Sequence, residues 1–239
     1  MKLLNYEINT ELPTVSLEDR LIVNTINPHS YCVAKKDEIF SQALHRSDVL
    51  LPDGAGIVLS AKVLQGKTIH RITGSDLHLH LLDLAQTNML RVFYLGASNE
   101  TLSAIRQKVA LEYPAVEIDV FSPPFKSEFS ADDNREMVSH INAFKPHILF
   151  VGMTAPKQEK WVYRNEKEID ANLICSIGAV FDFYTGRIKR PGKYWQRLGL
   201  EWLPRLVREP KRLFRRNFIS TPHFLWDVMV EKIKMTLKG

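Results

Sequence analysis

The chain has 239 residues, of which 45% are apolar and 25% are charged, with 11 Gly, 12 Pro and 2 Cys. These proportions are those of a globular protein and exclude a disordered chain, a collagen-like repeat and a disulfide scaffold. The net charge of +5 is unevenly distributed, since residues 187–217 hold eleven basic and two acidic residues. Such a basic block is typical of a segment that binds phosphate, in a nucleic acid, an anionic lipid or a diphosphate substrate.

The chain shows no signal for a membrane span or for secretion. Its longest uncharged apolar run, Leu173 to Phe181, is much shorter than the ~20 residues that cross a bilayer. The segment from Met1 to Glu11 lacks the apolar centre and the cleavage site of a secretory signal. We therefore expect a cytoplasmic protein in which Cys32 and Cys175 are reduced thiols.

Short β-rich runs alternate with longer segments of helical period. Strands are predicted at residues 21–26, 48–51, 91–95, 116–121, 148–152 and 173–177, and helices at about 30–45, 56–64, 76–88, 100–113, 132–144 and 157–169. The last two strand runs lack alternation, as strands buried on both faces do. The pattern predicts a Rossmann-like α/β layered domain with a largely parallel sheet.

The pattern changes after Gly186. Large apolar residues recur there every three or four positions among arginines, as expected for an amphipathic helix: Trp195, Leu198, Trp202 and Leu206. A last helix is predicted at about residues 222–237. We therefore divide the chain into an α/β domain, residues 1–186, and a basic amphipathic helical C-terminal appendage, residues 187–239.

The residues that follow the predicted strands are the first candidates for a site, because ligands bind beyond the carboxyl ends of the strands in an open α/β sheet. Thr25 and Asn27 end the first strand, ahead of a helix start that can receive an anion. Ordinary turn and cap chemistry explains the same residues. Asp53, in Pro52-Asp-Gly-Ala-Gly56, suits a general base, and a helix-capping aspartate is the structural alternative.

Two further junctions carry small or polar residues. Gly96 follows the third strand, and Gly152 opens the stretch Gly-Met-Thr-Ala-Pro-Lys-Gln-Glu. In that stretch Pro156 is the predicted first residue of a helix, with Gln158 and Glu159 in its first turn. A tight strand–helix junction, and a negative charge that complements the helix dipole, explain these residues without a ligand.

No metal site is predicted. The two cysteines lack a Cys-x-x-Cys partner, and His78 and His80 lie two positions apart, on different faces of a helix. The Asp-x-Asp pattern does not occur, so a divalent ion held by that kind of motif is not indicated.

Five stretches together resemble the WecG/TagA/CpsF family of bacterial glycosyltransferases. In the family's order, over about residues 20–217, they are Leu-Pro-Asp-Gly-Ala-Gly-Ile at 51–57, Arg-Ile-Thr-Gly-Ser-Asp-Leu at 71–77, Gly-Met-Thr-Ala-Pro-Lys-Gln-Glu-Lys-Trp at 152–161, Gly-Ala-Val-Phe-Asp-Phe-Tyr-Thr-Gly at 178–186 and Leu-Gly-Leu-Glu-Trp-Leu-Pro-Arg-Leu at 198–206. One such motif is weak evidence, whereas the five in order are specific.

The resemblance implies an inverting, metal-independent transfer of a sugar from a UDP-sugar to an undecaprenyl-diphosphate-linked saccharide. The donor sugar would be N-acetylmannosamine, its uronic acid, glucose or a similar sugar, and the product a cell-surface polysaccharide or teichoic acid. The reaction would take place at the inner face of the cytoplasmic membrane, with the protein bound peripherally to anionic lipid. No cofactor is implied, and a homo-oligomer is left open.

The resemblance also implies roles for individual residues. Asp53 would be the general base, with Thr25 and Arg71 as further catalytic residues, and Gln158 would line the pocket. We expect the substrate pocket to include also Asn27, Gly96, Gly152, Pro156, Glu159 and Asp182. The appendage would supply arginines to the acceptor diphosphate or the leaving group, and the matching positions are Arg205, Arg212 and Arg215. Fixed arginines can stabilise a departing diphosphate without a metal.

Two other classes of protein fit parts of the sequence. A nucleic-acid-binding module would explain the basic block, although the apolar residues there follow a helical period and form no stacking platform. A nicotinamide-dependent enzyme would explain the α/β pattern, but the glycine fingerprint of a dinucleotide site is incomplete.

Overall fold

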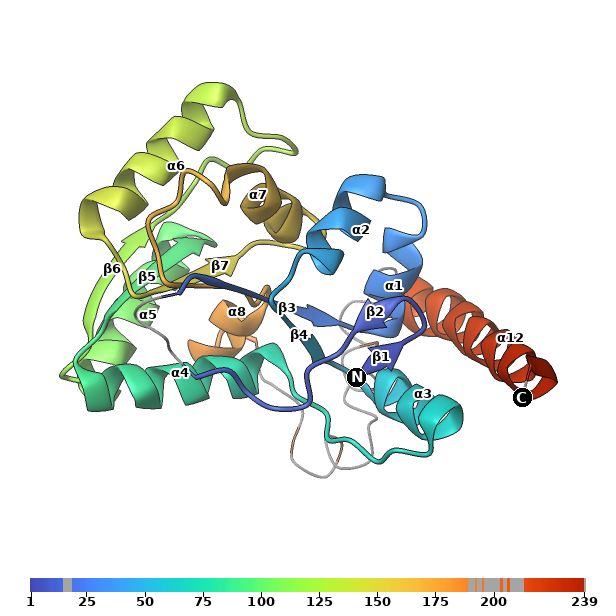
Figure 1. The fold of residues 1–239 in the computed structure, drawn as a ribbon. Coiled ribbons are helices and arrows are strands. Elements are labelled where there is room, and N and C mark those ends of the chain that lie inside the picture. The colour runs from blue at the N-terminus through green and yellow to red at the C-terminus, as the bar shows by residue number, and fades with distance from the viewer. Residues whose placement is uncertain are drawn as a thin grey trace.

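The protein, in a computed structural model that describes residues 1–14, 19–188, 192, 195, 203, 206 and 213–238, is built around one parallel sheet (Figure 1). The sheet has six strands in the order β4-β3-β8-β7-β5-β6. The strands are β3 (Leu21–Ile26), β4 (Val49–Pro52), β5 (Arg91–Gly96), β6 (Glu117–Phe121), β7 (Ile148–Gly152) and β8 (Leu173–Ser176). The predicted fold class and all six predicted strands are confirmed.

Helices cover both faces of the sheet. One face carries α4 (Gly74–Asn88), α5 (Asn99–Glu112) and α8 (Val180–Tyr184), and the other carries α6 (Ala131–Phe144) and α7 (Lys157–Asn165). Strand side chains alternate between the two, as Val92 packs in the first layer and Phe93 in the second. Because both layers are apolar, the central strands read as unbroken hydrophobic runs.

The region predicted as one helix over residues 30–45 is two helices. These are α1 (Pro28–Ala34) and α2 (Glu38–His45), separated by an extended residue, Asp37, whose side chain accepts a hydrogen bond from the Phe40 backbone N–H at 3.0 Å. An aspartate at an N-cap stabilises a new helix start, which explains the break. Helix α7 ends at Asn165, four residues before the predicted end, where the Glu166 carbonyl oxygen accepts from the Arg20 guanidinium.

A short antiparallel hairpin precedes the sheet and was not predicted. It consists of β1 (Lys2–Leu3) and β2 (Tyr6–Glu7), and strands of two residues are too short to show a period in the sequence. Its side chains Leu3 and Tyr6 belong to a second core that also contains Ile57 and Phe224. The N-terminal and C-terminal parts of the chain therefore share one apolar cluster.

The C-terminal helix packs against the α/β layers. A π-helical turn, η1 (Arg215–Ser220), leads into α12 (Thr221–Lys238), which contacts α1 and α3 (Ala55–Gln65) while its far end projects away from the sheet (Figure 1). The predicted last helix is confirmed. At Gly56 on α3, an added Cβ would lie 3.7 Å from Phe224 Cε1, an ordinary contact distance, and 2.5 Å from Pro28 Cγ on α1, where α1 and α3 approach closely. The proposed boundary at residue 186 stays a prediction.

We expect Phe224→Ala to lower the free energy of unfolding by about 3–5 kcal/mol, because a fully buried ring is lost from the second core. Trp226→Ala is the matched control in the same helix, since Trp226 is 70% exposed. It should change the free energy of unfolding by no more than about 0.5 kcal/mol. Urea unfolding followed by circular dichroism measures both, and equal effects would contradict the packing of α12.

Candidate active site

The carboxyl ends of the strands meet along one edge of the sheet. The strand order brings the residues after β4, β3, β8 and β7 to neighbouring positions on that edge. The chain leaves β3 toward the face of the sheet that carries α7, and there α2 contacts α7. The chain leaves β8 toward the opposite face, where α8 packs with α4 and α5. Connections that leave neighbouring strands toward opposite faces open a crevice between those strands, where open α/β sheets bind their ligands.

Asp53 lies in this edge, directly after β4. Its backbone N–H donates to the Ile26 carbonyl oxygen at 2.9 Å, which places Asp53 beside the end of β3. The N-cap of the following helix α3 is Gly54, and no side chain caps that helix. The Asp53 side chain is partly exposed at this edge of the sheet.

Arg71 is brought to the same edge by the backbone. The Ile72 N–H donates to the Pro52 carbonyl oxygen at 2.9 Å. This hydrogen bond holds the segment of Arg71 beside the end of β4, one residue before Asp53. Thr73 and Asp76, from the same motif, form the capping box of α4. The Arg71 side chain is partly exposed at this edge, where the family resemblance predicts a substrate contact.

Thr25 and Asn27 flank the end of β3. Thr25 pairs with Leu51 on β4 and is partly exposed. Asn27 caps α1, because its Oδ1 accepts from the backbone N–H groups of His29 and Ser30, both at 3.0 Å. The expected cap chemistry is confirmed for Asn27, and its side-chain oxygen is engaged by it.

Packing explains the two glycines of the predicted donor pocket. Gly96 and Gly152 are partners on β5 and β7, and a Cβ on Gly96, which has φ +113°, would lie 2.7 Å from the Gly152 carbonyl oxygen. A Cβ on Gly152 would lie 2.4 Å from the Phe181 ring. Their predicted contact with a substrate stays a prediction.

Pro156, predicted as the first residue of the helix, is the N-cap of α7, which begins one position later at Lys157. Gln158 and Glu159 lie in the first turn as predicted. Both side chains are only 4% exposed. The Gln158 Oε1 accepts from the backbone N–H groups of Met153 at 3.2 Å and Gly178 at 2.9 Å, and thereby joins the turns after β7 and β8. Gln158 Nε2 donates to Glu159 Oε1 at 2.9 Å.

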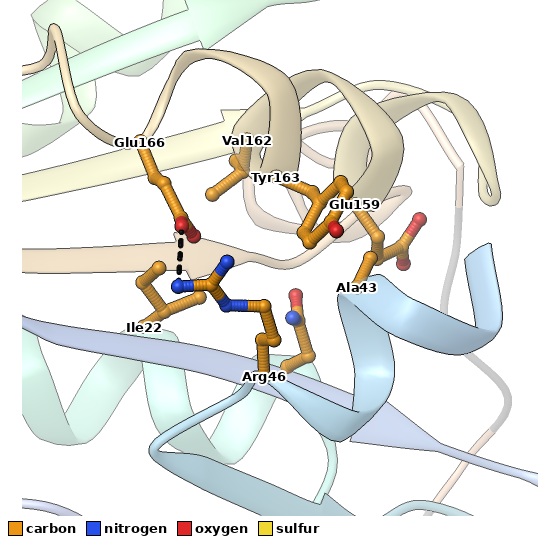
Figure 2. Close-up of a pocket in the computed structure, with 8 residues that line it drawn as sticks. Ile22, Ala43, Arg46, Glu159, Val162, Tyr163 and Glu166 are labelled. Atoms are coloured by element: carbon orange, nitrogen blue, oxygen red, sulfur yellow. Dashed lines mark ion pairs between the residues drawn. The ribbon is translucent and has the colours of Figure 1, made fainter. Parts of the chain in front are cut away.

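Glu159 is directed into a small pocket between α2, α7 and β3, behind the edge of the sheet (Figure 2). Burial raises the pKa of its carboxyl group to about 7. The Arg46 guanidinium in the same pocket is turned toward Glu166, which it binds at 3.2 Å, and not toward Glu159 (Figure 2). Sequence analysis placed Glu159 against the substrate, whereas its contact here is with Gln158.

Two polar residues of this region were missed by sequence analysis. Asn24 Oδ1 and Ser176 Oγ are buried and, like Glu159 Oε2, have no hydrogen-bond partner among the described residues. Asn24 and Ser176 follow the paired residues Val23 and Cys175 on the neighbouring strands β3 and β8. The available signal was a polar residue inside a mostly apolar run: Asn24, beside Thr25, in 21–26 and Ser176 in 173–177.

The basic C-terminal segment reaches this edge at α1. Ser220 Oγ lies 2.9 Å from His29 Nδ1, two residues after Asn27. Burial lowers the pKa of His29, and the nearby charges of Arg216 and Arg215 lower it further. Arg215 is thus brought close to the first junction, whereas Arg205 and Arg212 lie outside the described residues. Asp182, on α8, is partly exposed.

Metal-binding and membrane-spanning features are absent from the described part of the chain. It contains no cluster of three or more His, Cys, Asp or Glu side chains that could hold a metal ion. His78 and His80 have separate partners, the Tyr94 hydroxyl group at 2.8 Å and the Pro13 carbonyl oxygen at 3.1 Å. None of the helices there combines the length and hydropathy that a bilayer-spanning helix needs. Both cysteines are free, as predicted.

Comparison with known proteins gives the family. Residues 7–238 match the model of the "Glycosyl transferase WecG/TagA/CpsF family". Curated relatives named N-acetylglucosaminyldiphosphoundecaprenol N-acetyl-beta-D-mannosaminyltransferase occur in Bacillus spizizenii (30% identical, covering 86% of this chain and 77% of the relative), Bacillus subtilis (28%, covering 88% and 80%) and Staphylococcus aureus strain MW2 (28%, covering 91% and 83%). The chain belongs to the WecG/TagA/CpsF family and is a glycosyltransferase.

Proposed function

We propose that the protein transfers an N-acetylmannosaminyl or closely similar residue from a UDP-sugar to N-acetylglucosamine linked to undecaprenyl diphosphate. The names of the curated relatives supply the class of acceptor and of transferred sugar. The observation that carries the proposal is the juxtaposition at the sheet edge, where the Asp53 backbone is tied to β3 and the Arg71 segment to β4. A carboxylate and a guanidinium beside one crevice suit an acid–base reaction that releases an anion.

The reaction begins with the acceptor hydroxyl group. As its oxygen attacks the anomeric carbon of the donor sugar, the hydroxyl proton passes to the Asp53 carboxylate. The bond between the anomeric carbon and the UDP oxygen breaks on the opposite side, and its electron pair leaves with UDP. A single displacement of this kind inverts the anomeric configuration. Thr25, at the end of the neighbouring strand, would orient the attacking hydroxyl group.

The departing UDP gains negative charge, which must be stabilised in the transition state. Arg71, Arg215 and Arg216 are cationic candidates among the described residues, since Arg71 adjoins Asp53 through the backbone, and Arg216 and Arg215 both lower the pKa of His29 at the first junction. Preorganised cations near a developing anion commonly supply a large part of the catalytic effect. We infer that they replace the divalent ion on which other sugar-nucleotide enzymes rely.

The acceptor lipid requires that the enzyme work at a membrane surface, and α12 provides a suitable face. Trp226, Met229, Ile233 and Leu237 recur every three or four residues along this helix and are all exposed, whereas Phe224 and Val228 on the other side are buried. Exposed basic residues accompany this face, at Arg215, Lys232 and Lys234. Exposed aromatic and aliphatic side chains among cations bind anionic bilayers peripherally.

Product analysis tests the proposal. Purified protein is incubated with a panel of UDP-sugars and a synthetic lipid-diphosphate N-acetylglucosamine acceptor, and the products are identified by mass spectrometry and by the anomeric coupling in their NMR spectra. Transfer of an N-acetylmannosaminyl residue with inversion is expected. Retention of configuration, or no transfer with any donor in the panel, would contradict it.

We expect the same assay to keep its rate after treatment with EDTA. The physical reason is that arginine side chains, which cannot be removed by a chelator, stabilise the diphosphate. The control adds Mg²⁺ or Mn²⁺ after chelation. A strict requirement for the added ion would show that the reaction uses a metal.

A further inference from the structure

The side-chain amide of Gln158 is fixed at both ends. Its oxygen accepts from the backbone N–H groups of Met153 and Gly178, at 3.2 and 2.9 Å, and its nitrogen donates to Glu159 Oε1 at 2.9 Å. Because an amide oxygen has two lone pairs, the two backbone donors use its accepting capacity. Because both neighbours of this atom are N–H donors, the atom must be the amide oxygen and not the nitrogen. The remaining contact, to Glu159, holds the NH₂ group in place.

One N–H group of Gln158 remains available. The amide nitrogen carries two hydrogens, of which one is donated to Glu159, and no second acceptor for it occurs among the described residues. Gly178 leaves room beside this nitrogen, because even an added Cβ there would lie 3.7 Å away from Nε2. The amide thus presents a hydrogen-bond donor, and no acceptor, beside the turns that follow β7 and β8.

We propose that Glu159 is a positioning residue, which holds the Gln158 amide so that the site binds a hydrogen-bond acceptor of the substrate, such as a hydroxyl or phosphate oxygen. Glu159 acts through Gln158, since its own carboxyl group is buried behind the edge of the sheet. That the ligand is a sugar nucleotide or a lipid-linked saccharide rests on the proposed function. The orientation of the amide does not depend on the proposed function.

The charge of Glu159 sets the strength of this contact. Burial raises the pKa of its carboxyl group to about 7, so that the group is ionised above that pH and neutral below it. The other charged or titratable side chains of the pocket, from α2 and α7, have partners of their own: Arg46 binds Glu166, and the Tyr163 hydroxyl group donates to Gln42. On the same turn Lys160 binds Asp37 at 2.7 Å. An ionised acceptor forms a hydrogen bond about twice as strong as a neutral one.

The first test compares Glu159→Gln with the wild type across pH. This variant keeps the size of the side chain and an accepting oxygen but removes the charge. We expect wild-type kcat/KM to exceed that of the variant about fivefold at about pH 8.5, mainly through KM, and less than twofold at about pH 5.5. The titration of Asp53 is common to both proteins and cancels in the ratio. A ratio that does not change with pH would overturn the proposal.

A double-mutant cycle tests whether Glu159 acts through Gln158. In a Gln158→Ala background, Glu159→Gln should cause no further change in kcat/KM at high pH, because the group that it positions is absent. An additional loss equal to that in the wild-type background would overturn the positioning role.

A second measurement needs no substrate and separates this proposal from the proposed function. The side-chain NH₂ resonances of Gln158 are assigned in ¹⁵N-labelled full-length protein by comparison with Gln158→Ala. In the wild type the chemical shifts of these resonances should titrate with an apparent pKa of about 7, the pKa of the Glu159 carboxyl group. In Glu159→Gln the shifts should not change over this pH range. Shifts that stay constant in the wild type would refute the contact, whatever reaction the protein catalyses.

Discussion

Asp53→Asn should abolish sugar transfer while UDP binding and folding are kept. The asparagine has the size of the aspartate but cannot take the proton of the attacking hydroxyl group, and the loss of a general base typically lowers the rate by roughly 10²- to 10⁴-fold. The backbone contact of residue 53 with Ile26 does not involve the side chain and is retained. Initial rates with donor and acceptor, and calorimetric titration with UDP, measure the two properties.

Asp170→Asn is the matched control for that experiment. Asp170 is exposed and precedes β8, so it lies at the opposite edge of the sheet from Asp53 and undergoes the same change in charge. The transfer activity of Asp170→Asn should equal that of the wild type. Transfer by Asp53→Asn within a few-fold of the control would end the assignment of the base.

Arg215→Glu is expected to have the second largest effect, a loss of about 10²-fold in turnover on a short, soluble acceptor, because the leaving diphosphate loses a cation and meets a carboxylate. Lys232→Glu makes the same change in charge on α12, where the side chain is exposed. Both variants should weaken binding to anionic liposomes to a similar degree, by about fivefold for each lost basic residue. Only Arg215→Glu should lower turnover on the soluble acceptor.

Trp226→Ser should have the opposite pattern of effects from Arg215→Glu on turnover with the soluble acceptor. It removes an exposed apolar side chain from the proposed membrane face, so liposome binding should fall while turnover on the soluble acceptor is kept. If Arg215→Glu and Trp226→Ser change both measurements equally, the C-terminal segment is an anchor alone, and the leaving-group role returns to residues of the α/β domain such as Arg71. These point variants are preferable to deletion of the segment, because deletion would also remove Phe224 and Val228 from the second core.

The parallel sheet was predictable because its strands are apolar on both sides and alternate with amphipathic helices. The helix starts were predictable where a capping residue stands in the sequence, as with Ser130 ahead of α6. The break between α1 and α2 was missed because Asp37 reads equally well as part of a continuous helix, until its side chain is seen to accept from Phe40.

Some residues of the candidate site could likewise be predicted from the sequence, and others could not. Asp53 and Asn27 directly follow strands and Thr25 lies at the end of one, so the rule for open sheets finds them. Arg71 follows no strand and reaches the edge through the Ile72 bond to Pro52. The contact between Gln158 and Glu159 could not be predicted, because neighbouring residues on a helix ordinarily point in different directions. The roles of Asp53, Thr25 and Arg71 in the reaction stay predictions.

The packing of Phe224 near Gly56 would link the proposed lipid binding to the geometry of the proposed reaction. Gly56 lies in the first turn of α3, shortly after Asp53, and Pro28 begins α1, next to Asn27; a Cβ added at Gly56 would meet both Pro28 and Phe224, so the starts of α1 and α3 and the helix α12 lie together. A helix that lies on a bilayer would then hold the base at a constant height above the lipid headgroups. The acceptor is held at its own height by its lipid tail. Such an enzyme would select acceptors by the distance of their reactive hydroxyl group from the bilayer, and a saccharide extended by several sugars would place that group out of reach.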